Sequence, residues 1–452
     1  MRVCQYLRAH VIDAPRVWTH VDQIRNPTAL TFVLERAKNF PVVITNLPVE
    51  NADDVRFEAV AAHMHHIRTL GLNLSQSFGT FRTESRAHKA LTTTAPLLQL
   101  LSFCGRQFVA ANQRLVVNSN FSISESTLPR LSSLELRGVE STTLLFQQIQ
   151  SLSTVSFSGS ENFQHGQGSM AKCASRFLHN LTTINFELSG WNAAARYPEL
   201  GPAVRQINIR WTKPGFFISR NAVPNEAAWR SIRTVRVAHM CSSPGNTPPY
   251  DSASRNAIFG IPETEVPYQT LSVRTRGALD TRGNVRAVDR DGRERIVCGL
   301  HPSAVTYVLH YISTVELSAI TIAATIIALR IMSSEQCPVL RCIRLVLETD
   351  EITWIDRFAS DLHSIKTLER LEFSKAENPD TPNWTTAIII RVVSCCVGFG
   401  NSLQDVVFLG FTPDAQCLAM AQMFSQRVVV DQNWQEPKSE RDWFTEPPFK
   451  WD

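Results

Sequence analysis

The stretch Leu131-Ser132-Ser133-Leu134-Glu135-Leu136 decides the fold. It places apolar residues at its first, fourth and sixth positions. The last two are two residues apart, so their side chains point to the same face of a β-strand. The pattern recurs along nearly the whole chain, which predicts many short strands with one buried face. The copies lie at 67–72, 98–103, 152–157, 181–186, 204–209, 232–237, 312–317, 340–345, 368–373 and 403–408, with a weaker one at 268–273.

Stretches with helical periodicity separate these copies. The first is 28–39, where Asn26-Pro27 ahead is a helix start signal, and 41–44 follows as a buried strand. The spacing of the apolar residues in the strand copies is typical of a leucine-rich-repeat unit. The predicted fold class is therefore α/β, a curved leucine-rich-repeat-like solenoid of alternating helices and parallel strands. Further helices are expected at 53–64, 141–150, 169–180, 225–231, 303–311, 321–333, 353–365, 385–397 and 413–424, and a last strand at 428–430.

Two other architectures contain the same alternation of helices and strands. A closed barrel of eight strands is disfavoured because the chain has more strand candidates than that. A doubly wound nucleotide-binding sheet is disfavoured because no Gly-rich turn joins a strand to a helix.

The predicted solenoid spans 22–430 and is interrupted at 241–299. Within this insertion, residues 284–289 and 294–298 alternate in polarity on either side of Asp291-Gly292, which predicts a β-hairpin. The segment is rich in arginine, and two interpretations stay open. The charges protect a solvated hairpin edge, or they form a rim that contacts an acidic partner. The rim residues would be Arg274, Arg276, Arg286, Arg290, Arg293 and Arg295.

Composition limits the function classes. The 452 residues are 44% hydrophobic and 19% charged, which is typical of a globular protein. A net charge of +4 is too dilute to predict binding to nucleic acid or to an anionic membrane. The longest apolar stretch, between Glu316 and Arg330, is shorter than the ~20 residues that span a bilayer. The ten cysteines form no Cys-x-x-Cys, and charged residues interrupt any signal peptide, so a cytoplasmic or nuclear location is expected.

Known chemical motifs are also missing from the sequence. Asp289-x-Asp291-Gly292 lacks the remaining ligands of a calcium loop. The cluster of His63, His65 and His66 has no partner at metal-ligand spacing, and we expect surface histidines at a helix end. No Gly-x-Ser-x-Gly motif is present. We therefore predict no catalytic residue, no cofactor, no metal ion and no enzyme activity.

The C-terminal segment, 431–452, is rich in tryptophan and proline. Its aromatic residues are costly to leave in water, so we expect them to dock on the last repeat as a cap. The alternative is a peptide ligand for another protein. The residues are Trp434, Trp443, Phe444, Phe449 and Trp451.

Residues 1–21 carry a family resemblance. The string Val3-Cys4-x-x-Leu7-Arg8-Ala9, followed by Pro15-Arg16-Val17-Trp18, resembles the last helix of the F-box and its exit in mushroom-type fungal F-box proteins. Those proteins commonly carry irregular leucine-rich repeats after the F-box. Leu7 stands where the family usually has Trp, and the front of the F-box, with its Leu-Pro and Glu-Ile/Leu helix, is absent from the sequence.

The resemblance implies a substrate receptor of a cullin–RING ubiquitin ligase. The F-box would dock on the Skp-type adaptor while the repeats hold an unidentified protein target. The matching adaptor-side residues are Val3, Cys4, Leu7, Arg8, Pro15 and Trp18. One remaining helix buries little of the ~800 Å² per partner that a stable interface needs, so we expect weak or lost adaptor binding. The alternative is a repeat scaffold without a ubiquitin role.

Overall fold

The computed structural model describes the chain in separate stretches. These are residues 11–75, 84–105, 115–117, 125–137, 139–141, 149–159, 180–188, 201–211, 231–239, 268–274, 283–300, 309–318, 337–347, 367–375 and 402–435. The chain divides into two compact units, Met1–Ile232 and Arg233–Asp452. Each unit is built on a mostly parallel β-sheet, as the repeated strand pattern predicts.

The strands of the first unit pair in chain order, and every pair is parallel. This progression is typical of a repeat solenoid, whereas a doubly wound sheet reverses its strand order. The sheet strands are β1 (His20–Asp22), β2 (Val42–Val49), β3 (Ile67–Leu74), β4 (Leu100–Gly105), β6 (Ser133–Arg137), β8 (Thr154–Gly159), β9 (Thr183–Leu188) and β10 (Gln206–Trp211). Two short strands, β5 (Leu115–Val117) and β7 (Val139–Ser141), form a separate parallel pair.

The register of this sheet aligns the repeat copies with one another. Leu101 on β4 lies opposite Leu134 on β6, and Leu134 lies opposite Val155 on β8. All three side chains are fully buried, and so are Leu131 and Leu136 of the stretch 131–136, with at most 1% exposed. Burying one apolar side chain stabilises a fold by about 1.5–3 kcal/mol, so the stacked copies form the core.

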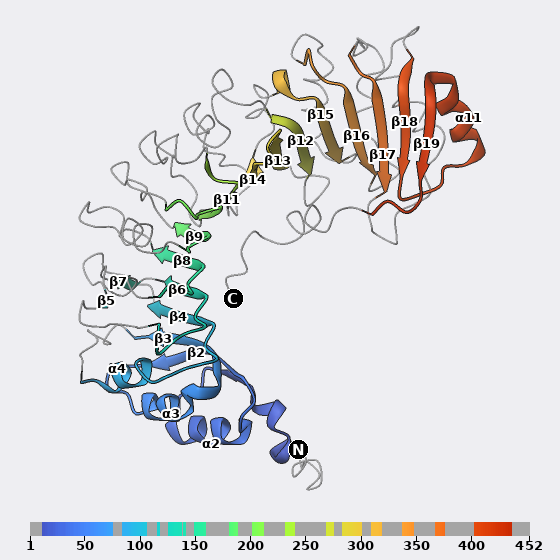
Figure 1. The fold of residues 1–452 in the computed structure, drawn as a ribbon. Helices are drawn as coiled ribbons and strands as arrows, with labels where there is room; N and C mark the ends of the chain where they lie inside the picture. Colours follow the sequence, from blue (N-terminus) through green and yellow to red (C-terminus); the bar gives the residue numbers. More distant parts are fainter. Residues whose placement is uncertain are drawn as a thin grey trace, which may run out of the picture. The chain divides into compact units, whose positions relative to one another are not determined.

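Three helices cover the apolar side of β2 and β3, and Figure 1 shows them grouped beside these strands. They are α2 (Pro27–Ala37), α3 (Arg56–His63) and α4 (Arg86–Leu91). The predicted start of the first helix is confirmed, because the Asn26 side chain accepts hydrogen bonds from the Thr28 and Ala29 amides at 2.9 and 3.3 Å. Leu30 and Leu34 on α2 are fully buried.

Most of the later predicted helices lie outside the described residues. The exceptions include residues 309–311, which form a 3₁₀ turn, and the last helix, α11 (Ala415–Phe424). Ser141, where the helix at 141–150 was predicted to begin, ends strand β7 instead. Asp414 caps α11 by accepting a hydrogen bond from the Cys417 amide at 2.6 Å. No helix in the described part of the chain has the length and apolar character needed to cross a membrane.

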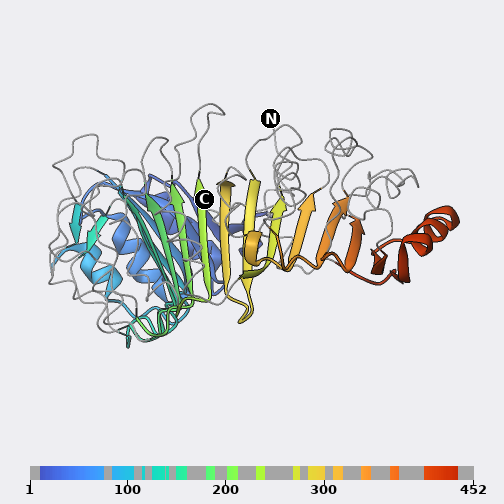
Figure 2. The same cartoon turned by 90° about the horizontal axis from the view of Figure 1, so that it is seen from above.

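The second unit holds a sheet with one rearranged section. Its strands, in spatial order, are β11 (Thr234–His239), β14 (Glu294–Leu300), β13 (Gly283–Asp289), β12 (Tyr268–Arg274), β15 (Thr314–Ser318), β16 (Cys342–Leu347), β17 (Arg370–Lys375), β18 (Leu403–Leu409) and β19 (Ser425–Asp431). Only the β12–β13 and β13–β14 pairs are antiparallel. Figure 2 shows the unit from above, with the strands from β15 onward in orange and red.

The insertion is therefore a three-stranded meander placed in reverse order between β11 and β15. The predicted hairpin is confirmed as β13 and β14. Its turn is fixed by Asp289, whose Oδ1 accepts hydrogen bonds from the Asp291 and Arg293 amides at 2.9 and 2.8 Å. Gly292 adopts φ +73°, a conformation that favours glycine.

Candidate functional site

The second face of each sheet is lined by the residue that lies between the last two apolar positions of each copy. In the first unit these residues are small and polar on β8, β9 and β10. Asn208 Nδ2 donates a hydrogen bond to Asn185 Oδ1 at 2.6 Å, and Asn185 Nδ2 donates to Ser156 Oγ at 2.9 Å. The parallel register places these three side chains opposite one another. They form an uncharged ladder of satisfied polar groups across three strands.

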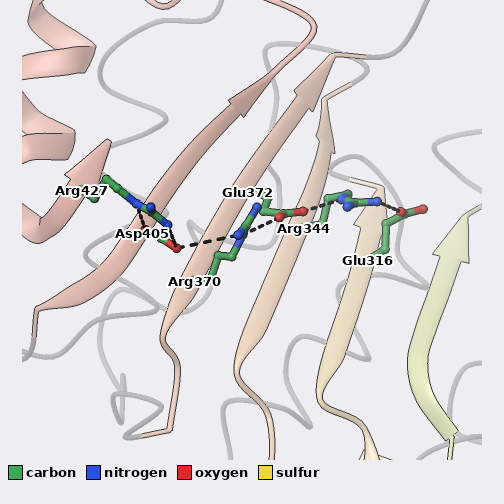
Figure 3. A network of polar contacts seen from close by, with 6 residues as sticks. All are labelled: Glu316, Arg344, Arg370, Glu372, Asp405 and Arg427. Atoms are coloured by element: carbon green, nitrogen blue, oxygen red, sulfur yellow. Dashed lines mark hydrogen bonds and ion pairs between the residues drawn. The ribbon is translucent and has the colours of Figure 1, made fainter. Parts of the chain in front are cut away.

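In the second unit the same position carries a charge on β15, β16 and β17. Arg344 on β16 lies in register with Glu316 on β15 and Glu372 on β17. Its Nη1 donates to Glu316 Oε2 at 3.2 Å, and its Nε donates to Glu372 Oε2 at 2.7 Å (Figure 3). The side chains of both glutamates are about one-twentieth exposed, at 5% and 6%. Buried carboxylates need a partner of opposite charge, and Arg344 is the partner of both glutamates.

A second row, two residues earlier on each strand, extends this arrangement. Arg370 Nε lies 2.6 Å from Glu372 Oε1, and Arg370 Nη1 lies 3.7 Å from Asp405 Oδ2. Arg427 on β19 contacts Asp405 through Nε at 2.6 Å and Nη2 at 3.0 Å. We call Glu316, Arg344, Glu372, Arg370, Asp405 and Arg427 the charge ladder (Figure 3). The negative charges of its three acidic side chains and the positive charges of its three arginines cancel.

The ladder alters the protonation of its members and of a neighbouring thiol. Burial disfavours the charged form of Arg344, but Glu372 and Glu316 outweigh this effect and raise the Arg344 pKa. The hydrogen bonds from Arg427 hold the pKa of Asp405 below its ordinary value. Burial, with Glu372 nearby, raises the pKa of Cys342 to about 12, so this thiol is no nucleophile near neutral pH.

Trp434, from the C-terminal segment, also contacts the charge ladder. The Cζ atom of Arg344 lies 5.8 Å from the centre of the Trp434 ring, within cation–π range. A Cβ on Gly410, just after β18, would lie 3.2 Å from the Trp434 carbonyl oxygen. Trp434 thus contacts the polar face at β16 and the end of β18, and the expected cap over the last repeat stays a prediction. Trp443, Phe444, Phe449 and Trp451 lie outside the described residues.

At the N-terminus, Val3, Cys4, Leu7 and Arg8 lie outside the described residues. Pro15 begins and Trp18 ends the 3₁₀ helix η1 (Pro15–Trp18). Trp18 Nε1 donates a hydrogen bond to the Val11 carbonyl oxygen at 3.1 Å. Its ring packs edge-on against Phe32 of α2, with centroids 5.8 Å apart. The segment therefore rests on the first helix of the repeat array.

The arginines of the insertion are mostly engaged within the hairpin. Arg286 contacts Glu294 at 2.5 Å, and Arg293 contacts Asp289 at 2.6 Å. Arg295 is buried and donates to the Glu294 carbonyl oxygen at 2.9 Å. Arg290 is exposed in the turn. Arg274 ends β12, and Arg276 lies outside the described residues.

The histidine cluster is on the surface as expected at His65, which is exposed, but not at His66. His66 belongs to a short 3₁₀ helix, η2 (Met64–His66), and is only 1% exposed. The turn points it inward, where its ring lies 4.7 Å from that of His65. Burial lowers the His66 pKa to about 4, with His65 and His63 adding to the shift. The Phe40 and Lys38 carbonyls favour the protonated form, but neither ring nitrogen has a partner with hydrogen-bond geometry.

A buried ion pair lies beside a shallow pocket of about 250 Å³ at the ends of β2 and β3. Arg56 Nε donates to Asp54 Oδ1 at 2.8 Å, and both side chains are 8% exposed. Burial tends to raise the Asp54 pKa, yet the hydrogen bonds from Arg56 and Glu50 together lower it. Within the described ranges, no group of three or more His, Cys, Asp or Glu side chains could hold a metal ion.

The charge ladder was not predicted, because the strand pattern considers only the apolar positions of each copy and not the residue between them. That residue is Glu316, Arg344 and Glu372 on three consecutive copies, an alternation that the sequence displays. Combined with a parallel register, it would have predicted the ion pairs. Neither the scan against protein-family models nor the search of curated proteins finds a match for this chain.

Proposed function

We propose that this chain is a non-catalytic receptor that binds a protein target through the polar faces of its sheets. The observation that carries this proposal is the in-register polar ladder on one face, opposite a fully buried apolar face. On this face Asn185, Arg344 and Arg370 stay partly exposed, and repeat proteins use such a surface over consecutive strands for binding. The exposed Arg290 adds a positive charge at the hairpin turn for an acidic partner.

In its finer form, the proposal is a substrate receptor of a cullin–RING ubiquitin ligase. Support comes from the F-box resemblance of Val3, Cys4, Leu7, Arg8, Pro15 and Trp18. The packing of Trp18 on Phe32 fits this role, because it would fix an adaptor-bound helix to the first repeat. A helix that is held rigidly would carry the bound target at a set distance from the ligase.

The test is binding of a purified Skp-type adaptor to the immobilised chain. We expect weak binding that is lost in Arg8→Glu, because Arg8 matches the adaptor-side helix. The matched control is Arg25→Glu, an exposed arginine outside the resemblance, which should bind like the wild type. A version extended upstream through any in-frame Leu-Pro-x-Glu segment should bind more tightly. Equal retention by all versions, or retention by none, would remove the ubiquitin role.

A repeat scaffold without a ubiquitin role is the second candidate. It is favoured by the same N-terminal packing, because η1 and Trp18 cover the first helix as a terminal cap would. In this case the chain binds its target and no adaptor. The Arg8→Glu and Arg25→Glu variants then give identical traces with the adaptor.

A further inference from the structure

The chain turns back on itself directly after β19. The Gly410 amide donates a hydrogen bond to the Asp431 carbonyl oxygen at 2.8 Å. Gln432 Nε2 donates to Thr412 Oγ1 at 2.8 Å, and the Asn433 amide donates to Asp431 Oδ1 at 3.2 Å. These bonds fix the direction of the segment that follows. They direct the chain toward the polar face of the sheet that carries the charge ladder.

Trp434 is the first residue of that segment to reach the charge ladder. The in-plane N–H groups of Arg344 are directed at Glu316 and Glu372, one on either side. A guanidinium held in this way keeps its flat face for stacking, and an aromatic ring is the group that stacks there. The Trp434 ring lies 5.8 Å from the Arg344 Cζ atom. The Arg344 side chain is 26% exposed.

We propose that residues 432–435 form a strap that closes over Arg344, and that a protein partner displaces it by placing its own aromatic side chain there. The inference rests on the proposed function, in which the polar face binds a protein. The face of Arg344 is then a binding subsite for an aromatic ring, and Trp434 of the strap occupies it in the free protein. A single cation–π contact shifts an equilibrium by about 2- to 30-fold, so the strap opens without unfolding the sheet.

The first test measures how quickly phenylglyoxal modifies Arg344 in the full chain, by peptide mass spectrometry. Arg341, which is 62% exposed just before the same strand, is the internal reference. Trp434→Ala should raise the ratio of Arg344 to Arg341 modification by about 2- to 30-fold. Trp434→Phe, which keeps a ring, should raise it less. An unchanged ratio in Trp434→Ala would overturn the strap.

A matched pair of glycine variants separates the strap from general destabilisation. Gly410 and Gly292 both adopt positive φ, at 76° and 73°, so an alanine strains both backbones similarly. Only at Gly410 would the new Cβ meet the strap, 3.2 Å from the Trp434 carbonyl oxygen. The modification ratio should therefore rise in Gly410→Ala and stay at the wild-type value in Gly292→Ala. Equal ratios in the two variants would contradict the strap.

The aromatic subsite is tested with a small probe in Trp434→Ala. N-acetyl-tryptophanamide should protect Arg344 from modification, whereas N-acetyl-leucinamide should not. Equal protection by both probes, or by neither, overturns the subsite. These measurements need no protein partner. If the modification and protection experiments give the expected results but no target binds the polar face, the strap is supported and the proposed function is not.

Discussion

Replacing Arg344 by methionine should destabilise the second unit far more than the same change at Arg341. Arg344 lies on β16 and Arg341 just before it, and each forms an ion pair with at least one glutamate. Arg344 serves two carboxylates whose side chains are 5% and 6% exposed, whereas Arg341 and its partner Glu369 are 62% and 37% exposed. The two substitutions therefore remove similar charges from different environments.

The expected magnitudes follow from these environments. Removing one member of a fully buried ion pair costs about 3–5 kcal/mol. Arg344 is partly exposed, and Glu372 keeps Arg370 at 2.6 Å, so we expect a loss of about 2–3 kcal/mol. An exposed pair contributes about 0–1 kcal/mol, which is the expected effect of Arg341→Met.

The assay is urea unfolding followed by circular dichroism, with hydrogen exchange of residues 342–347 to locate the effect. Adding Glu316→Gln to Arg344→Met should recover part of the loss, because a buried carboxylate is removed with its partner. If Arg344→Met and Arg341→Met differ by less than about 1 kcal/mol, the ladder does not stabilise the sheet as argued.

Three further predictions concern the rest of the chain. His66 has a pKa of about 4 when folded and about 6.5 when unfolded, so the unfolded state binds the proton first as pH falls. Stability should drop between these values by up to about 1.4 kcal/mol per pH unit. Urea midpoints at pH 7 and 5 should show a smaller dependence in His66→Leu, where His63 with its lowered pKa remains, and a largely kept dependence in His65→Gln. Asp54→Asn should cost about 3–5 kcal/mol at pH 7, since it leaves Arg56 buried without its carboxylate. Because folding lowers the Asp54 pKa, the difference in unfolding free energy between wild type and Asp54→Asn should shrink as pH falls below about 4. A difference that persists in acid would argue against the ion pair. Phe408→Ala should cost about 3–5 kcal/mol in urea unfolding, as it leaves a cavity beside Phe373, and a loss below about 1 kcal/mol would mean the stacked copies do not form the core.

The repeated strand pattern allowed much of the fold to be predicted from sequence. A period-two apolar pair fixes which face is buried, and identical spacing in successive copies fixes the register. For this reason Leu134 and Val155 lie opposite one another as expected. The start of α2 was predictable because Asn26-Pro27 is a local signal that needs no tertiary contact.

Long-range choices could not be predicted in the same way. The turn at Asp291-Gly292 indicates a hairpin, but not that β14 pairs with β11 while β12 pairs with β15. Either strand of a meander can join a neighbouring edge, and the sequence pattern is the same in both cases. The burial of His66 was missed because it depends on the 3₁₀ turn of η2 rather than on residue type.

The candidate site was predictable only in part. The residues between the apolar positions could be read as polar, and their alternating charge was visible in the sequence. The contact of Trp434 with Arg344 joins the segment after β19 to β16, which lies far earlier in the sequence, so no local sequence pattern could predict it. The aromatic content of the segment predicted docking on the last repeat, whereas Trp434 contacts Arg344 on β16.

Site-specific photocrosslinking tests whether a protein target binds the polar face of the sheet. A photoreactive amino acid is placed at Ser133 on β6 or Thr183 on β9, both on the polar face and partly exposed. The matched control position is Phe32 on α2, which is exposed on the helical side. We predict that one target protein crosslinks from Ser133 and Thr183 and not from Phe32. Crosslinking of the target from Phe32 alone would show that the helical side, and not the polar face, binds it.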